Sequence, residues 1–381
     1  MITQDARQVR PVVIFVGAFG GTGISEVVGG QLAACRALLE SRAAREVEWR
    51  LIDSTMLSIP PPSFAIRVKA AVKRVVRVLW LVSREQISCI LLFTADGMSF
   101  LEKGTIGALG RLLGKHVVLA PRSGMLIDDL VTGPWVRRLL WRVLFCAPNV
   151  VVCQSDSWAR FFAVRLRTGG QRLEVIRNGI RIVERQRVQR TLSKHGAVTF
   201  LYLGWLERFK GPDILAAAFL KIHRSYPEVR LRICGRGTLD RELREHLREA
   251  SECGQVEFAG WVEGGTKEDA LNQSDCLVLP SLREGAPNVV LEALERGLPV
   301  ICTRVGAVPE MLQLGRLGTL VTPGSIEEMA TALENFIHNP CAAIRVACEA
   351  RSYVKEVHDL EKTGEQWVSL VRSRRSPITV V

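Results

Sequence analysis

Short apolar runs alternate along this chain with longer stretches in which apolar residues recur at helical spacing. The runs are typical of buried strands and the periodic stretches of helices. Predicted strands are 11–16, 49–52, 87–94, 117–120, 150–154, 175–180, 199–203, 231–234, 256–262, 277–279, 300–302 and 320–321. The periodic stretches are 25–45, 64–84, 135–145, 239–249, 289–296, 326–338 and 354–372. This alternation predicts an α/β protein.

The length of the chain indicates more than one domain. A single core rarely serves 381 residues, so two domains of roughly 150 to 200 residues are expected. Residues 181–196 are polar and poor in large apolar groups, as in an interdomain linker. We therefore predict domains over 1–185 and 196–353, followed by a segment 354–381 whose last nine residues are loose.

The segment 277–310 carries the strongest chemical signal. An apolar run is followed by a loop rich in glycine and proline, then by a helix whose start is predicted near Glu284 and Gly285. A helix start attracts phosphate through its free N–H groups, and Glu284 and Glu292 could accept hydrogen bonds from sugar hydroxyls. The alternative is that Glu284 only stabilises the helix start and Glu292 is a solvated acid.

The same segment resembles a known signature. The run E-G-A-P-N-V-V-L-E-A, followed by G-L-P-V and G-A-V-P-E, is similar to the nucleotide-sugar motif of retaining glycosyltransferases of family 4 (glycosyl transferases group 1). The resemblance implies a GT-B fold, in which two Rossmann-like domains face each other across a cleft. It further implies that 1–185 binds the acceptor, that 196–353 binds the donor, and that the last helix crosses back to the first domain.

The resemblance also assigns roles to single residues. Lys210 matches a family lysine in the loop after strand 199–203, whereas Trp205 stands where the family has an arginine. Arg208 either replaces that arginine from a shifted position, beside the donor diphosphate, or is a solvated cation. Glu284 would hold the transferred sugar and Glu292 the ribose. The remaining donor-binding residues implied are Gly285, Ala286, Asn288, Gly235, Trp261 and Val262.

Two features of the first half remain open at this stage. The loop G-x-x-G-G-x-G at 17–23, with Gly20 and Gly21, is either a tight turn or a ligand loop, and it is not the dinucleotide fingerprint. The resemblance favours a ligand loop. Arg122 occupies the place of a family histidine, so it could face a phosphate, face an acidic acceptor group, or be solvated.

Two basic stretches, 64–84 and 135–145, interleave Lys and Arg with Val, Leu and Trp. Such helices lie in membrane interfaces, or they pack their apolar sides on their own sheet. The net charge of +12 indicates an anionic partner, which could be nucleic acid, anionic lipid or a phosphorylated substrate.

Ten scattered cysteines lack metal-ligand spacing, and we interpret them as reduced core residues of a cytoplasmic protein. The N-terminal apolar run is too short for a signal peptide. We expect a cytoplasmic enzyme, with 64–84 and 135–145 as a possible contact with the inner face of the membrane. No metal and no cofactor are expected.

The sequence thus predicts a retaining glycosyltransferase that uses a UDP- or GDP-sugar and a glycan or lipid-linked acceptor, in cell-surface polysaccharide synthesis. Lys210, Arg208 and Glu284 are its expected catalytic residues, without a nucleic-acid partner. Three alternatives stay open. They are a sugar phosphorylase or nucleotide-sugar epimerase of the same fold, a basic nucleic-acid-binding protein, and an NAD enzyme, the last being weakest for want of the fingerprint.

Overall fold

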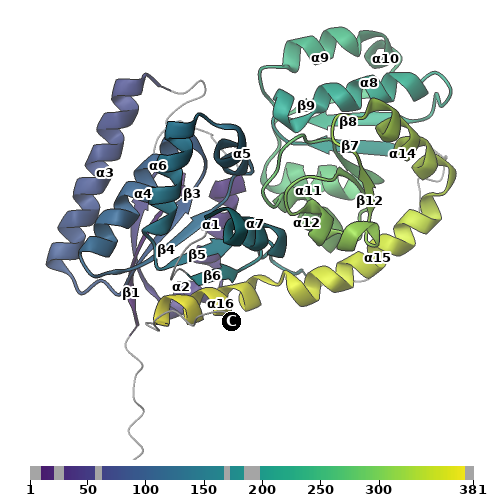
Figure 1. The fold of residues 1–381 in the computed structure, drawn as a ribbon. Helices are drawn as coiled ribbons and strands as arrows, with labels where there is room; N and C mark the ends of the chain where they lie inside the picture. The colour runs from purple at the N-terminus through teal and green to yellow at the C-terminus, as the bar shows by residue number, and fades with distance from the viewer. Residues whose placement is uncertain (1–9, 21–29, 56–61, 167–171, 184–197, 374–381) are drawn as a thin grey trace, which may run out of the picture. The chain divides into compact units, whose positions relative to one another are not determined.

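The computed structural model of the protein describes residues 10–20, 30–55, 62–166, 172–183 and 198–373. Contacts divide the chain into two compact units. The first consists of Met1–Arg181 together with Leu360–Val381, and the second of Ile182–Asp359. Each unit contains a six-stranded parallel sheet flanked by helices (Figure 1). The predicted α/β class is confirmed.

The first sheet has the strand order β2-β1-β3-β4-β5-β6, with every neighbouring pair parallel. Its strands are β1 (Val12–Gly17), β2 (Glu48–Asp53), β3 (Cys89–Thr94), β4 (His116–Pro121), β5 (Val150–Cys153) and β6 (Arg172–Val175). Parallel strands require crossover connections, which these helices supply. They are α1 (Gly30–Glu40), α2 (Ala43–Glu46), α3 (Phe64–Arg84), α4 (Gly97–Leu112), α5 (Met125–Thr132), α6 (Trp135–Cys146) and α7 (Asp156–Leu166), with α16 (Leu360–Arg372) joining from the end of the chain.

The second sheet has the order β12-β11-β10-β7-β8-β9, which is the doubly wound order of dinucleotide-binding domains. Its strands are β7 (Thr199–Leu203), β8 (Arg230–Cys234), β9 (Val256–Gly260), β10 (Cys276–Leu279), β11 (Val300–Thr303) and β12 (Thr319–Val321). Its helices are α8 (Pro212–Ile222), α9 (Asp240–His246), α10 (Arg248–Glu252), α11 (Gly264–Gln273), α12 (Asn288–Glu295), α13 (Val308–Met311), α14 (Ile326–His338) and α15 (Pro340–Val357), with 3-10 turns η1 (Arg208–Lys210) and η2 (Gln313–Gly315).

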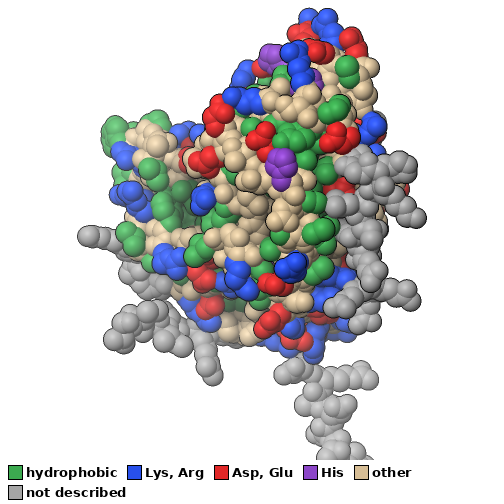
Figure 2. All heavy atoms as spheres, turned by 90° about the vertical axis from the view of Figure 1, so that its right-hand side faces the viewer, with side chains coloured by type: hydrophobic (Ala, Val, Ile, Leu, Met, Phe, Trp, Pro, Cys, Tyr) green, Lys and Arg blue, Asp and Glu red, His purple; other side chains and the backbone are tan. Residues whose placement is uncertain are grey.

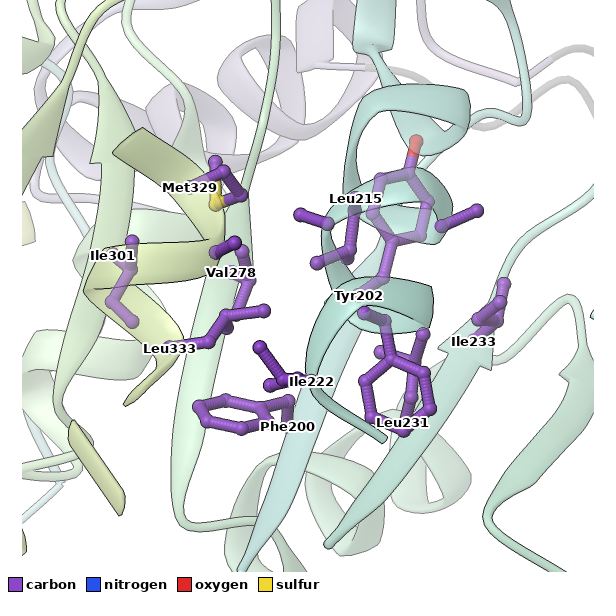
Figure 3. Close-up of a cluster of buried hydrophobic side chains, with 14 of the residues drawn as sticks. Phe200, Tyr202, Leu215, Ile222, Leu231, Ile233, Val278, Ile301, Met329 and Leu333 are labelled. Atoms are coloured by element: carbon purple, nitrogen blue, oxygen red, sulfur yellow. The ribbon is translucent and has the colours of Figure 1, made fainter. Parts of the chain in front are cut away.

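Strands buried on both faces explain the continuous apolar runs. In β1, Ile14 and Val16 belong to one core cluster, whereas Val13 and Phe15 belong to another on the opposite face of the sheet. In the second unit, side chains of β7, β8 and β10 pack against α8 and α14, with Phe200 and Tyr202 among them (Figure 3). Burial on two faces removes the alternation of polar and apolar residues that a half-exposed strand would show.

Three predicted helices are in fact divided. The stretch 25–45 is α1 and α2 over its described part, because the Ser41 hydroxyl accepts the N–H of Ala43 at 3.2 Å and competes with the helical bonds. The stretch 239–249 is α9 followed by α10. The stretch 354–372 breaks after α15, where the N–H of Leu360 donates to the Ile180 carbonyl at 3.0 Å.

Two further predictions need correction. The strand predicted at 175–180 lies earlier, as β6, whose partly exposed Arg172 and Glu174 hid it from an apolar search. The cysteines are all free, but Cys146, Cys253, Cys341 and Cys348 are exposed rather than in a core. Within the described part of the chain, no helix is both long enough and apolar enough to cross a bilayer.

Helix α16 completes the core of the first unit. Trp367 is 2% exposed and lies in the same cluster as Phe15 and Leu91, with its ring 5.4 Å from that of Phe93. At Gly364 the helix approaches α1 and α2 so closely that a Cβ would lie 2.5 Å from the Ser41 hydroxyl. Helix α16 is therefore a core element of the first unit, although most of that unit comes from the N-terminal half of the chain.

We predict that Trp367→Ala lowers the free energy of unfolding by about 3–5 kcal/mol, because it leaves a large cavity between α16 and the sheet. Urea unfolding followed by circular dichroism measures the change. Gln366→Ala removes an exposed side chain of the same helix and should change stability by less than about 0.5 kcal/mol. Equal unfolding midpoints for the two variants would contradict a core role for α16.

Candidate active site

The central pair of strands in the second sheet, β7 and β10, marks the point where the strand order reverses. Ligands of open α/β sheets bind beyond the carboxyl ends of the strands at such a point. The loop after β7 contains η1, and the loop after β10 runs to Pro287. The N–H of Leu282 donates to the Phe209 carbonyl at 2.9 Å. Gly211, at φ +64°, lies so close to β10 that a Cβ would be 2.2 Å from the Pro280 oxygen.

Lys210 and Glu284 meet where these two loops touch. The Nζ of Lys210 lies 2.6 Å from Oε1 of Glu284, and the Ser281 hydroxyl donates to the same oxygen at 2.7 Å. The Glu284 side chain is 7% exposed and that of Lys210 is 20% exposed. The cation and the carboxylate are therefore held in a fixed, largely dehydrated geometry.

The G-A-V-P-E segment of the signature contacts the loop that carries Glu284. The N–H of Ala307 donates to the Gly285 carbonyl at 2.8 Å. Gly306 adopts φ +55°, and a Cβ there would lie 2.3 Å from the Glu284 carbonyl oxygen. The G-A-V-P-E segment thus packs directly against the backbone that carries Glu284.

The helix of the signature starts later than predicted. Helix α12 begins at Asn288, and its N-cap is Pro287 with an extended ψ of 114°. A residue that precedes proline is disfavoured in helical conformation, which keeps Ala286 and the residues before it in the loop. Gly285 is therefore buried loop backbone, and the first turn of the helix begins at Asn288. The predicted end is confirmed, since Gly297 follows the helix at φ +63°.

The two other predicted charges of this site contact different partners. Arg208 is 68% exposed and pairs with Glu242 at 3.2 Å and Asp213 at 3.7 Å, so its described ion pairs are with these two acids and not with Glu284. Glu292 lies on α12 and contacts Lys267 of α11 at 2.5 Å. Sequence reasoning missed Lys267, because a lone lysine in a polar helix carries no pattern.

Glycines bring the loops after β7 and β8 into backbone contact. The N–H of Gly235 donates to the Gly260 carbonyl at 2.7 Å. A Cβ on Gly235 would lie 2.0 Å from the Gly204 oxygen. The three carboxyl ends of β7, β8 and β9 are therefore held together.

Aromatic rings cover these strand ends. The rings of Trp205 and Trp261 lie 4.6 Å apart, and the Arg236 guanidinium lies 5.5 Å and 5.1 Å from them. Trp261 donates to Glu263 at 2.6 Å, and Val262 follows it in the same half-buried loop. Arg236 was not predicted, although it stands between the glycines of G-R-G. The cluster offers flat surfaces and a cation.

In the first unit, Gly20 lies at the end of β1 with φ +74°, and its N–H donates to the Thr55 hydroxyl at 3.0 Å. Gly21 lies outside the described residues. Arg122 is not a solvated loop residue. Its guanidinium lies 4.1 Å from the ring of Phe93 and donates to the Asn178 side chain at 2.9 Å, and burial lowers its pKa to about 10.

Metal-ligating side chains do not gather in the described residues, where no group of three His, Cys, Asp or Glu could hold an ion. The polar groups described at the switch point include Lys210, Glu284, the Ser281 hydroxyl and backbone amides. Such groups bind anions and hydroxyls.

Comparison with known proteins shows a family match over most of the second unit. Residues 197–339 match the family described as glycosyl transferases group 1. The chain is thus similar to glycosyl transferases group 1 over 143 of its 381 residues. The matched range contains Lys210, Glu284 and Glu292, together with the aromatic cluster.

Relatives by sequence include glycogen synthase of Mycobacterium tuberculosis, 28% identical over 254 residues that cover 64% of this chain and 61% of the relative. Phosphatidyl-myo-inositol mannosyltransferase of Mycolicibacterium smegmatis is 35% identical over 35% of each chain. The alignment with the glycogen synthase thus spans less than two thirds of that relative's length.

Solved structures share the whole fold. Sucrose-phosphate synthase from Thermosynechococcus elongatus superposes with a TM-score of 0.78 at 19% identity, covering 95% of this chain and 98% of that one. The Anabaena protein Alr3699/HepE in complex with UDP gives 0.70 at 15% identity, covering 95% and 99%. The fold is GT-B.

We predict that Gly235→Ala destabilises the second unit by about 1–3 kcal/mol, because the new methyl group must push the β7 loop away. Gly265→Ala is the matched control, since a Cβ at Gly265 would meet nothing within 4 Å. Urea unfolding of both variants measures the difference in stability. A Gly235→Ala protein as stable as the control would show that the loops after β7 and β8 do not touch through their backbones.

Proposed function

We propose that the protein is a glycosyltransferase that moves a sugar from a nucleotide diphosphate sugar to a glycan or lipid-linked acceptor, with retention of anomeric configuration. One observation carries the proposal. Lys210 and Glu284 come from the two loops of the switch point and lie in direct contact at 2.6 Å. The group 1 match over 197–339, and the names of the relatives, support sugar transfer as the reaction.

At the reacting end of the donor, Lys210 would neutralise charge on the leaving diphosphate. The N–H groups at the start of α12 would add to this, because their dipoles point toward the same loop. Glu284 would accept hydrogen bonds from hydroxyls of the transferred sugar. Its fixed geometry matters, since a preorganised charge needs no rearrangement when the bond breaks. Arg208 remains a predicted second cation, and it would have to leave Glu242 to reach the diphosphate.

At the nucleoside end, Glu292 would accept hydrogen bonds from the ribose hydroxyls. It would keep its ion pair with Lys267 at the same time. The base would lie near Gly235 and the backbone of Trp261 and Val262. The known structure of Alr3699/HepE with UDP favours a uridine donor, and a GDP-sugar is the alternative. Gly285, Ala286 and Asn288 would approach the phosphates and sugar through their backbone.

On the acceptor side, we assign binding to the first unit, in which Gly20 remains a candidate ligand-loop residue at the turn after β1. Arg122 supports the packing of α16 through Phe93, so its role toward an acceptor would be indirect. We place the enzyme in the cytoplasm, in the synthesis of cell-surface polysaccharide, and we propose that it needs neither metal nor cofactor.

A sugar phosphorylase or a nucleotide-sugar epimerase of this fold is the nearest rival. Neither releases free nucleotide in proportion to added acceptor. Detection of nucleotide only when donor and acceptor are both present therefore separates a transferase from these two.

We predict that Lys210→Ala and Glu284→Ala each lower turnover by about 100- to 1,000-fold, in line with the loss of one preorganised group worth roughly 3–4 kcal/mol. Nucleotide release in the presence of acceptor measures this. Lys221→Ala is the control, because Lys221 is an exposed lysine of α8 that pairs with Glu327. Circular dichroism checks the fold of all three variants, and near-normal turnover of both site variants would refute the assignment.

We predict that the product has the anomeric configuration of the donor, and that the rate is unchanged by excess EDTA. Lys210 and the N–H groups at the start of α12 would supply the charge stabilisation that a metal ion otherwise gives to a leaving diphosphate. Proton NMR of the anomeric signal early in the reaction measures the configuration. An inverted product, or a rate that EDTA abolishes and Mg²⁺ restores, would show that the proposed chemistry is wrong.

A further inference from the structure

Helix α3 has an outer face that is exposed in the part of the chain that the structure describes. Its inner side is anchored by buried Val78 and Leu81, and by Arg74, which donates to Glu102 of α4 at 2.9 Å. The opposite side leaves Val72 56% exposed, Val76 59% and Trp80 46%. Packing on the sheet therefore accounts for only one of the two apolar sides of this helix.

Cations lie among these exposed apolar groups. Lys69, Lys73 and Arg77 are exposed on the same side of the helix, and the Arg77 guanidinium lies 4.5 Å from the Trp80 ring. The 21 residues of α3 contain no Asp or Glu. The outer face of α3 therefore combines exposed apolar side chains with charged side chains that are all basic.

Helix α6 repeats the pattern. Its inner residues Trp141, Leu144 and Phe145 are buried. Its outer residues include Trp135 at 71% exposure and Val143 at 60%. Leu139 is also exposed, and α6 contains no acid. Arg137 pairs with Asp129 of α5 at 2.9 Å, and helical spacing places Arg142 on the outer side with Leu139.

The two outer faces belong to one layer of the first unit. Helices α3 and α6 both contact α4, and their buried residues join one core cluster on the same side of the sheet. Phe100 of α4 lies 5.0 Å from Trp141, and Leu144 of α6 lies against Gly104. Figure 1 shows α3, α4 and α6 next to one another in the first unit. Because their inner sides meet the same sheet face, their outer sides point away from it together.

We propose that the outer faces of α3 and α6 form a docking surface for an anionic lipid bilayer. Indole rings and aliphatic groups enter the headgroup boundary, while Lys and Arg bind the lipid phosphates. Nucleic acid fits this surface less well, because phosphate contacts would leave the valines and tryptophans between the cations without a partner. A protein partner would need a surface that both buries these apolar groups and carries several acids. A bilayer with anionic lipid offers an apolar interior and negative phosphates over its whole surface, so it meets both needs without a specific sequence.

The docking surface concerns the first unit and goes beyond the proposed reaction. Together, the two predict that a lipid-linked acceptor is met at the membrane surface. Binding to vesicles needs neither donor nor acceptor, so the test of docking is independent of any activity.

The experiment is co-sedimentation of the full chain with vesicles of phosphatidylcholine alone, or of phosphatidylcholine with phosphatidylglycerol. We expect binding to the mixed vesicles, weak binding to the neutral ones, and a loss of binding as salt is raised. The double variant Val76→Asp with Val143→Asp should lower the partition coefficient by about tenfold or more, since it places an acid on each outer face.

The matched control is the double variant Val164→Asp with Leu314→Asp. It changes the same net charge at exposed apolar positions of α7 and η2, at 74% and 82% exposure. It should bind vesicles like the unchanged protein, and circular dichroism and urea unfolding check the fold of both double variants.

Three results would overturn the proposal. They are equal loss of binding in the test and control variants, equal binding to neutral and anionic vesicles, or unchanged binding of the Val76→Asp, Val143→Asp protein. A parallel titration with duplex DNA tests the nucleic-acid alternative. Tight DNA binding that the same variant abolishes, with no vesicle binding, would assign the surface to nucleic acid instead.

Discussion

The second unit depends on the ion pair between Lys210 and Glu284. A carboxylate that is 7% exposed is stable inside a protein only when a cation or hydrogen-bond donors compensate it, and here Lys210 and Ser281 do so. The pair joins the loop after β7 to the loop after β10, and its two residues are 74 positions apart in sequence. Removing either partner would leave the other charge buried, so the same contact that organises the site also constrains the fold around it.

Glycines make that contact possible. Gly211, Gly235 and Gly306 each stand where a side chain would collide with a backbone carbonyl of a neighbouring loop. The loops therefore touch through main-chain atoms, which places them with less freedom than side-chain packing would allow. A rigid frame of this kind suits a site whose chemistry is electrostatic, because misplacing a charge by a fraction of an ångström weakens its effect.

The sequence predicted the fold class because parallel strands buried on two faces appear as uninterrupted apolar runs. It failed where local geometry overrode periodicity. Pro287 delayed the start of α12, and Ser41 ended α1 within a stretch that is apolar at helical spacing. The β6 strand escaped notice since its Arg172 and Glu174 side chains are only half-buried.

Part of the candidate site could also be read from sequence. Lys210, Glu284 and Glu292 lie in recognisable motifs, and the strand order brings the first two together. Their actual partners could not be predicted. Lys267 reaches Glu292 from another helix, and Arg236 lies against Trp205 and Trp261 only because three strands end side by side. The stacking of Arg122 on Phe93 likewise depends on contacts across the sheet.

The return of α16 to the first unit has a consequence for the order of folding. During synthesis, residues 182–359 emerge before Trp367 and Val371, which belong to the core of the first unit. The face of the N-terminal sheet that α16 covers therefore stays exposed until the second unit has been synthesised. Although domains generally fold from the N-terminus as they are synthesised, in this chain the second unit can reach its final structure first.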